Sequence, residues 1–381
     1  MQYKHLAFFG LAGLAAAQDG SLNATLAGNA QLSNLTSFLG MNPAIMEALS
    51  SANDITILAP TDEAFAALLE TPAGMALSAD PGLLAAALTY HVLNGTFMAD
   101  QITDTSAFVP TLLTNETYSN VTGGQVVQAV RKEDKVVFFS GLLQNSTVIQ
   151  ADVQFDGGVI HIVDIVLTLP ASVLDTTAAA GLTALRGAVN ATNLLEAVNA
   201  PDITIFAPNN EAFQNIGSAL PSSTEDLSKI LAYHVISGTV GYSSGLTSGA
   251  SLQTANGANL TITIDDAGTV FVNSARVITA DVLIANGVVH VIDNVLNPEN
   301  ASATPSASAT AGAPAFSGTP VSDVPFTSGQ PKPTAPMSPP SENTSAVASS
   351  GAPAEATGAA VKNGAVGLGA LFGAGVAVFF V

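Results

Sequence analysis

Apolar positions in the middle of the chain follow two patterns, one typical of strands and one typical of helices. A short β-branched run at 55–58 predicts a strand, which Pro60 ends because proline cannot donate to a sheet ladder. Thr61 can then cap a helix with an acidic first turn, and residues 81–91 carry an apolar stripe at helical spacing. The almost wholly apolar run 159–167 predicts a strand covered on both faces.

The same patterns occur a second time along the chain. The matching segments are 54–65 with 202–213, 90–92 with 233–235, and 151–167 with 280–296. The spacing between matches shrinks along the chain, so the first copy carries the longer loops, which tolerate such changes. A duplication on this scale predicts two tandem domains, which we place at 18–170 and 171–298.

Both ends of the chain have the composition of targeting segments. Residues 1–17 carry a positive start, an apolar run and small residues, which predicts a signal peptide rather than a short buried helix. The uncharged apolar tail 364–381 predicts a GPI-anchor signal, with a single-pass tail anchor as the alternative. The candidate attachment residues are Ser350, Gly358 and Asn363. The Pro-, Ser- and Thr-rich stretch 299–363 predicts a disordered, O-glycosylated stalk and anchor spacer.

Acceptor patterns for N-glycosylation are abundant, which fits a secreted chain. They occur at Asn23, Asn34, Asn94, Asn115, Asn120, Asn145, Asn190, Asn259, Asn300 and Asn343.

The composition narrows the chemistry that the chain can perform. There is no cysteine, which excludes disulfides, thiolate metal ligands and cysteine nucleophiles. The net charge of −20 disfavours nucleic acid as a partner. No nucleophile elbow or phosphate-binding glycine loop is present, so we predict no enzymatic activity, no catalytic residues and no cofactor.

The histidines are the remaining candidates for a chemical site. Each copy has two at equivalent positions, and a metal pair is one interpretation of them. Zinc normally takes three or four ligands at defined spacing, and no such signature is present. We therefore predict hydrogen-bonded core histidines and no metal site, and we expect Asp164 and Asp293 to accept backbone hydrogen bonds.

The three repeated motifs together resemble the fasciclin-like domain. They read Thr-Ile-Phe-Ala-Pro-x-x-Glu-Ala-Phe, Tyr-His-Val and Asn-Gly-Val-Val-His-Val-Ile-Asp-x-Val-Leu, and both copies carry versions of them in this order. The resemblance implies an α+β fold in which each domain is a twisted β-sandwich or wedge with packed helices. It also implies adhesion contacts, as in the GPI-anchored surface glycoproteins of fungi and plants. The contact residues that the resemblance implies are Asp152, Val153, Asp281, Val282, Tyr90, His91, Tyr233 and His234.

These observations favour a cell-surface adhesion glycoprotein. Its expected partners are cell-surface, matrix or wall components, either protein or glycan, together with the membrane through the lipid anchor and weak self-association. Its expected location is the extracellular face of the plasma membrane or the cell wall, with secretion or the vacuole as alternatives. Two further functions remain open, namely a structural wall glycoprotein and a surface protein that binds lipid or another small ligand.

Overall fold

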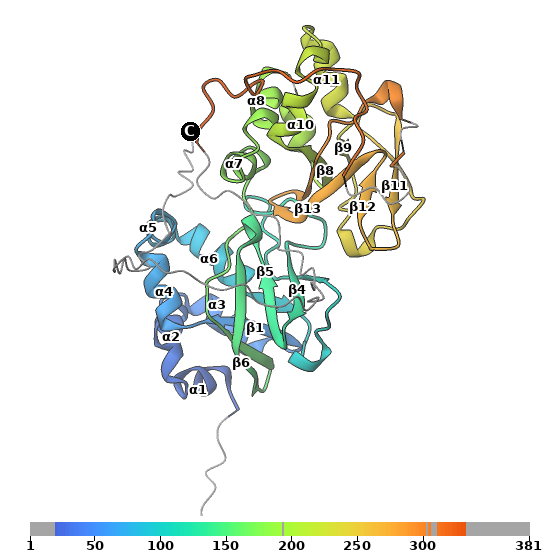
Figure 1. The fold of residues 1–381 in the computed structure, drawn as a ribbon. Helices are drawn as coiled ribbons and strands as arrows, with labels where there is room; N and C mark the ends of the chain where they lie inside the picture. The colour runs from blue at the N-terminus through green and yellow to red at the C-terminus, as the bar shows by residue number, and fades with distance from the viewer. Residues whose placement is uncertain (1–19, 193, 302–303, 306–310, 333–381) are drawn as a thin grey trace, which may run out of the picture.

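The computed structural model describes residues 20–332 apart from 193, 302–303 and 306–310. Two units follow one another along the chain, each with a seven-stranded sheet and packed helices, as Figure 1 shows. The expected α+β fold with two tandem domains is confirmed. The predicted signal peptide, Asn343, the three anchor-attachment candidates and the apolar tail lie outside the described residues.

The two sheets repeat one topology. The first has the order β2-β1-β7-β6-β5-β4-β3 and the second has the order β10-β11-β12-β13-β14-β8-β9. The strands of the first domain are β1 (Ile55–Pro60), β2 (Val92–Asn94), β3 (Ala107–Pro110), β4 (Val126–Lys132), β5 (Lys135–Phe139), β6 (Asn145–Phe155) and β7 (Gly158–Val163). Those of the second are β8 (Ile203–Pro208), β9 (Val235–Ile236), β10 (Ser251–Gln253), β11 (Asn259–Ile264), β12 (Val270–Val272), β13 (Ala275–Ile284) and β14 (Gly287–Ile292).

One parallel strand pair lies inside each sheet, and its residues are covered on both faces. β1 pairs with β7, and β8 pairs with β14, while the other pairings are antiparallel. Every residue of β1, β8 and β14 is buried, as near-continuous apolar runs require. The predicted covered strand is therefore present, although it ends at Val163 rather than at 167.

Each domain has its own set of helices, two of which begin at the capping residues that the sequence predicts. Those of the first domain are α1 (Leu22–Ala27), α2 (Ser33–Met41), α3 (Pro43–Ser51), α4 (Asp62–Leu69), α5 (Pro72–Ala79) and α6 (Pro81–Tyr90). Those of the second are α7 (Val173–Ala179), α8 (Thr183–Ala191), α9 (Leu195–Val198), α10 (Asn210–Asn215) and α11 (Thr224–Ala232). The Thr61 hydroxyl accepts from the N–H of Ala64 at 3.1 Å, and Asn209 caps α10 in the same way.

Apolar side chains pack on both faces of each sheet, and each face has its own cluster. In the first domain, Phe65 and Leu88 belong to one cluster, while Tyr90 and Phe138 belong to the other. The second domain repeats this division with Phe213 on one side and Tyr233 on the other. Within the described residues, no helix is both long enough and apolar enough to cross a bilayer.

Residues 311–332, which we call the strap, lie against the helices of the second domain (Figure 1). The ring of Phe326 packs edge-on against Phe213 with centroids 6.1 Å apart. Arg186 Nη1 donates to Gln330 Oε1 at 2.7 Å, and the N–H of Val321 donates to a carbonyl of α10.

The strap differs from the expectation of a disordered stalk beginning at 299. The sequence suggests that two phenylalanines are too few to offset the chain entropy of this stretch. The folded second domain supplies a preformed apolar surface, against which Phe316, Val324 and Phe326 pack. A few spaced apolar side chains are sufficient to order a segment when the opposite surface is already folded.

Candidate functional site

Two histidines end the helices that precede β2 and β9, and both are fully bonded inside the protein. His91 Nδ1 donates to the carbonyl of Ala87 at 2.7 Å, while its Nε2 accepts from the N–H of Leu167 at 2.9 Å. His234 makes the equivalent two bonds at 2.8 and 2.9 Å. Burial lowers the pKa of both histidines to about 4, so both rings are neutral at neutral pH. The prediction of hydrogen-bonded core histidines is confirmed for this pair.

The other two histidines lie on β7 and β14 and hold a neighbouring strand in place. His161 Nε2 donates to the carbonyl of Phe97 at 2.7 Å, and its Nδ1 accepts from the N–H of Asp152 at 3.2 Å. His290 accepts from the N–H of Asp281 at 3.3 Å and donates to a carbonyl at 2.8 Å. Burial lowers the pKa of His161. In the described part of the chain, no three His, Asp or Glu side chains gather where they could hold a metal ion.

Each of these histidines supports a β-bulge in the strand beside it. Asp152 and Asp281 sit at the bulges with φ values of 59° and 63°, and the pairing register shifts between Val148 and Val153 and between Val277 and Val282. The Asp152 carboxylate accepts from the N–H of Ala99 at 2.9 Å, and the Asp281 carboxylate accepts from the N–H and hydroxyl of Ser243. These bonds stabilise a left-handed conformation that is uncommon for residues other than glycine. We call residues 149–153 the first bulge and residues 278–282 the second bulge.

The two bulges share one backbone design but differ in exposure. The Asp152 side chain is 34% exposed, whereas the Asp281 side chain is 5% exposed. Ile149 is 51% exposed. A short 3₁₀ turn of the first domain, Gly141–Leu143, lies against β13 and packs Leu143 onto the core of the second domain. The strand that carries the second bulge is thus covered by the other domain, whereas the first bulge keeps exposed residues in the described part of the chain.

Most of the predicted contact residues are buried. Tyr90 and Tyr233 are 0% exposed, and each donates its hydroxyl to a backbone carbonyl inside its own domain. The two helix-ending histidines described above are buried with them, as are Asp281 and Val282. These residues pack inside the fold, and the contact role that the resemblance implies for them stays a prediction. Asp152 and Val153 are the two predicted contact residues that remain partly exposed.

The acidic residues at the ends of β7 and β14 accept backbone hydrogen bonds, as predicted. Asp164 Oδ1 accepts from the N–H of Thr147 at 2.7 Å, and Asp293 Oδ1 accepts from the N–H of Arg276 at 2.8 Å.

The two domains contact each other directly. Thr122 of the first domain donates its N–H and its hydroxyl to the carboxylate of Asp202 at 2.7 and 2.5 Å. Gln125 Nε2 donates to a carbonyl at the end of β13 at 3.1 Å, and both groups are buried. The rings of Phe108 and Tyr242 stack across the interface with centroids 4.1 Å apart. Polar and aromatic contacts together therefore fix one domain against the other.

The residue equivalent to Asp202 in the first domain has a local role. Asp54 has a φ value of 59°, close to the 52° of Asp202. Its carboxylate accepts from the N–H of Thr96 at 2.8 Å, within its own domain. The repeated aspartate therefore stabilises a turn in the first domain, where it is Asp54. In the second domain, where it is Asp202, it bonds to the first domain.

The predicted glycan acceptors differ in their surroundings. The side chain of Asn34 is half-buried, and its Nδ2 donates to the carbonyl of Asp62 at 3.3 Å. Asn120 is exposed, although the threonine of its acceptor pattern is the residue that binds Asp202. The remaining described acceptors are exposed, namely Asn23, Asn94, Asn115, Asn145, Asn190, Asn259 and Asn300. Occupancy of all these sites stays a prediction.

Comparison with known protein families identifies both repeats. The Fasciclin domain model matches residues 30–170 and 180–298, in agreement with the two units of the fold. The chain belongs to the fasciclin domain family. A "Fasciclin-like arabinogalactan protein" of Arthroderma benhamiae is 39% identical to this fasciclin-domain chain over 310 residues, covering 80% of the chain and 73% of the relative. "Fasciclin-like arabinogalactan protein CTB11" of Cercospora beticola is 29% identical, covering 73% and 76%.

Two further proteins match this chain over different lengths. "Cell surface glycolipoprotein MPB83" of Mycobacterium bovis is 38% identical over 120 residues, which is 30% of this chain and 53% of that protein. The solved FAS1 domain pair of the insect cell adhesion molecule fasciclin I aligns with a TM-score of 0.35 at 23% identity, covering 71% of this chain and 98% of that one.

Proposed function

We propose that this protein is a surface adhesion glycoprotein that contacts its partner through the first bulge, residues 149–153. The observation that carries the proposal is the difference between the two bulges. Strand β13, which carries the second bulge, already lies against the 3₁₀ turn of Leu143, and the Asp281 side chain is 5% exposed. The first bulge repeats the same backbone, with Ile149 at 51% exposure, and has no such cover within the described residues.

The chemistry of the first bulge indicates the kind of partner. An exposed aliphatic side chain and a partly exposed carboxylate, both within residues 149–153, suit a protein surface that offers an apolar depression and a hydrogen-bond donor. The net charge of −20 favours approach to neutral or basic surfaces. Since one bulge in each chain is free, avidity would come from several tethered copies rather than from two sites in one chain.

A pair of matched variants tests the proposed contact. Ile149→Ser removes the exposed aliphatic side chain of the first bulge, and Leu195→Ser is the control because Leu195 is 43% exposed on the second domain. We expect Ile149→Ser to weaken binding of the purified protein to whole cells or wall fractions about tenfold, equivalent to about 1.4 kcal/mol. The control should bind like the unmodified protein. Equal binding by all three proteins would remove the first bulge from consideration and favour the structural wall role.

The proposed location is the extracellular face of the plasma membrane or the wall, held there by a GPI anchor. Support comes from the predicted targeting segments and from relatives whose names describe cell-surface glycoproteins. A phosphatidylinositol-specific phospholipase should release the protein from intact cells into the medium. Retention in the membrane fraction after complete digestion would favour the tail anchor.

A further inference from the structure

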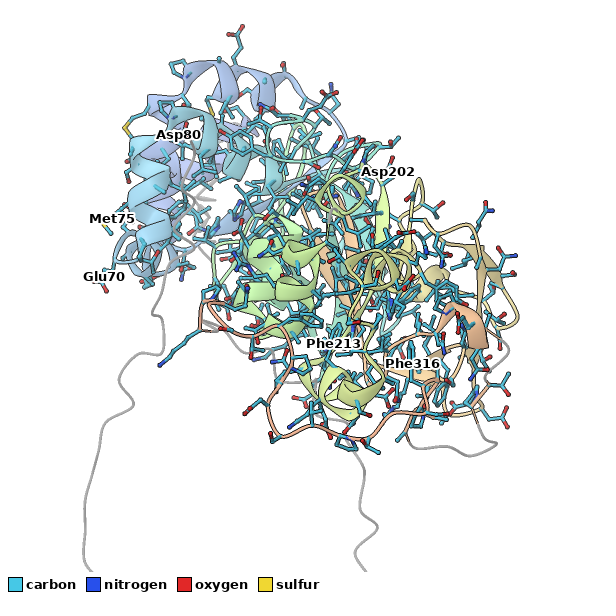
Figure 2. The ribbon with its side chains drawn as sticks, turned by 90° about the horizontal axis from the view of Figure 1, so that it is seen from above. Glu70, Met75, Asp80, Asp202, Phe213 and Phe316 are labelled. Atoms are coloured by element: carbon cyan, nitrogen blue, oxygen red, sulfur yellow. The ribbon has the colours of Figure 1, made fainter. Side chains whose placement is uncertain are left out.

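An open pocket of about 480 Å³ lies between Phe108 of β3, in the first domain, and the segment 239–252 of the second domain. We call it the junction pocket. Figure 2 labels Asp202, whose carboxylate bonds to Thr122 where the two domains meet. Sites for small molecules in proteins have volumes of about 300–1,000 Å³. The junction pocket is therefore large enough to hold a small molecule.

Two hydrogen bonds identify the residue of the first domain that corresponds to Gly241 in the pocket wall. The N–H of Phe97 donates to Thr56 Oγ1 in β1 at 2.9 Å, and the N–H of Gly241 donates to Thr204 Oγ1 in β8 at 2.8 Å. The carbonyls of the same two residues accept from the equivalent histidines of β7 and β14. Phe97 and Gly241 therefore occupy the same backbone position in the two copies.

The first domain fills this position with its own aromatic ring. Phe97 packs against the apolar cluster that contains Phe138. In the second domain, a Cβ at Gly241 would lie 3.4 Å from Thr204 Oγ1 and 3.5 Å from Leu246 Cδ2, and both of these residues line the pocket. A side chain at position 241 would thus point into the pocket. The pocket is therefore open on the side of the backbone where the first domain holds a ring.

The wall of the junction pocket suits an uncharged aromatic ring. Phe108 and Tyr242 supply aromatic surface, and their rings stack with centroids 4.1 Å apart. Leu246 and Leu252 supply aliphatic surface. None of the described residues that line the pocket is charged, so a charged ligand would lose hydration without gaining an ionic partner.

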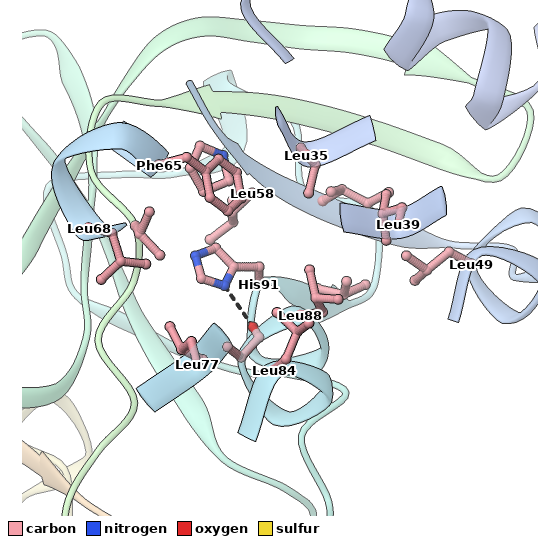
Figure 3. Close-up of a pocket in the computed structure, with 15 residues that line it drawn as sticks. Leu35, Leu39, Leu49, Leu58, Phe65, Leu68, Leu77, Leu84, Leu88 and His91 are labelled. Carbon is pink, nitrogen blue, oxygen red and sulfur yellow. Dashed lines mark hydrogen bonds between the residues drawn. The ribbon is translucent and has the colours of Figure 1, made fainter. Parts of the chain in front are cut away.

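The apolar space in the core of the first domain is much smaller than the junction pocket. It has a volume of about 40 Å³, and leucines such as Leu39 and Leu88 form most of its wall (Figure 3). A cavity that accepts benzene has a volume of about 150 Å³. The core space is therefore too small for a ring, whereas the junction pocket is large enough for a ring and a polar substituent.

We propose that the junction pocket binds an uncharged molecule with one aromatic ring, which takes the place that Phe97 holds in the first domain. A polar substituent on the ligand would bond to the exposed hydroxyls of Thr239, Ser244 and Thr247, which line the pocket. A free aromatic alcohol and the phenylalanine side chain of another protein share this chemistry. The site is separate from the first bulge and does not depend on the proposed adhesion contact.

Titration of the purified protein with 2-phenylethanol, followed by NMR, tests the proposal. We expect saturable binding at one site, and phenylacetate at neutral pH should bind at least about tenfold more weakly because its carboxylate finds no cation in the pocket. Gly241→Phe, which copies the first domain, should weaken binding at least about tenfold because its ring fills the site. Ser237→Phe is the matched control and should bind like the unmodified protein, since Ser237 is exposed on the same loop and does not line the pocket.

A second variant covers the case in which Gly241→Phe does not fold. Phe108→Leu keeps an apolar wall, leaves the second domain unaltered, and should weaken binding of 2-phenylethanol about fivefold because an aromatic contact is lost. An equal effect of Ser237→Phe and Gly241→Phe would contradict the proposed position of the ring.

A blocked tripeptide with a central phenylalanine, flanked by glycines, distinguishes the two sources of the ring. Binding tighter than that of 2-phenylethanol would support a phenylalanine of a partner protein, and weaker binding would support a free aromatic compound. Failure of the unmodified protein to bind either ligand, or unchanged binding by folded Gly241→Phe, would overturn the proposal. Either result would leave the adhesion contact at the first bulge unaffected.

Discussion

Lowering the pH from 7 to 5 is expected to destabilise each domain through one buried histidine. His91 and His234 are neutral in the folded protein, and burial lowers their pKa from 6.5 to about 4. Between these two pKa values the unfolded chain binds protons that the folded chain does not. Stability is therefore fully present above pH 6.5 and is lost as the pH falls toward 4.

The size of the effect follows from the two pKa values. A histidine with these values loses about 2 kcal/mol of stabilisation between pH 7 and pH 5, and about 3 kcal/mol once the pH reaches 4. Carboxylates remain largely ionised above pH 5, so this window isolates the imidazoles. His161, whose pKa is also lowered, adds an effect of the same sign in the first domain.

Urea unfolding at several pH values between 7 and 5 measures this loss. His91→Gln should flatten the pH dependence of the first domain and His234→Gln that of the second, since an amide can replace both hydrogen bonds without titrating. Glu225→Gln is the control, because this exposed carboxylate should not alter the slope in the window. An unchanged slope in the His91→Gln/His234→Gln double variant would refute the assignment.

Three further predictions concern the strap, the domain interface and the sheet. Phe326→Ala should destabilise the second domain by about 2 kcal/mol in thermal unfolding, because the ring is half-buried against α10. Ser328 is exposed, so Ser328→Ala should leave the stability unchanged. Asp202→Asn should weaken the charged hydrogen bonds between the domains by about 1 kcal/mol. Small-angle scattering should then show a broader distribution of distances between the domains. Asp54→Asn, the control, should leave those distances unchanged. Gly158→Ala should destabilise the first domain by about 3 kcal/mol in urea unfolding, since its Cβ would lie 1.9 Å from a carbonyl oxygen of β1; wild-type stability would contradict this packing.

Local pattern predicted the elements that depend on short-range contacts. Thr61 caps α4 because its hydroxyl reaches an amide three residues ahead, and His91 bonds to the carbonyl four residues behind it in the same helix. Both depend on spacing along the chain, which the sequence displays directly. The apolar run of β7 likewise predicts a strand covered on both faces.

The sequence by itself determined that one domain is built twice and which residues form its core. The tertiary structure alone decided how the copies differ. Equivalent aspartates at the two bulges carry the same local motif, yet the side chain of Asp152 is 34% exposed and that of Asp281 is 5% exposed, on a strand that lies against a turn of the other domain. Phe326 orders the strap through Phe213, more than a hundred residues away in the chain. Which residues are exposed, and therefore where the candidate contact site lies, depends on packing between residues that are distant in the chain. The periodicity of the sequence does not encode that packing.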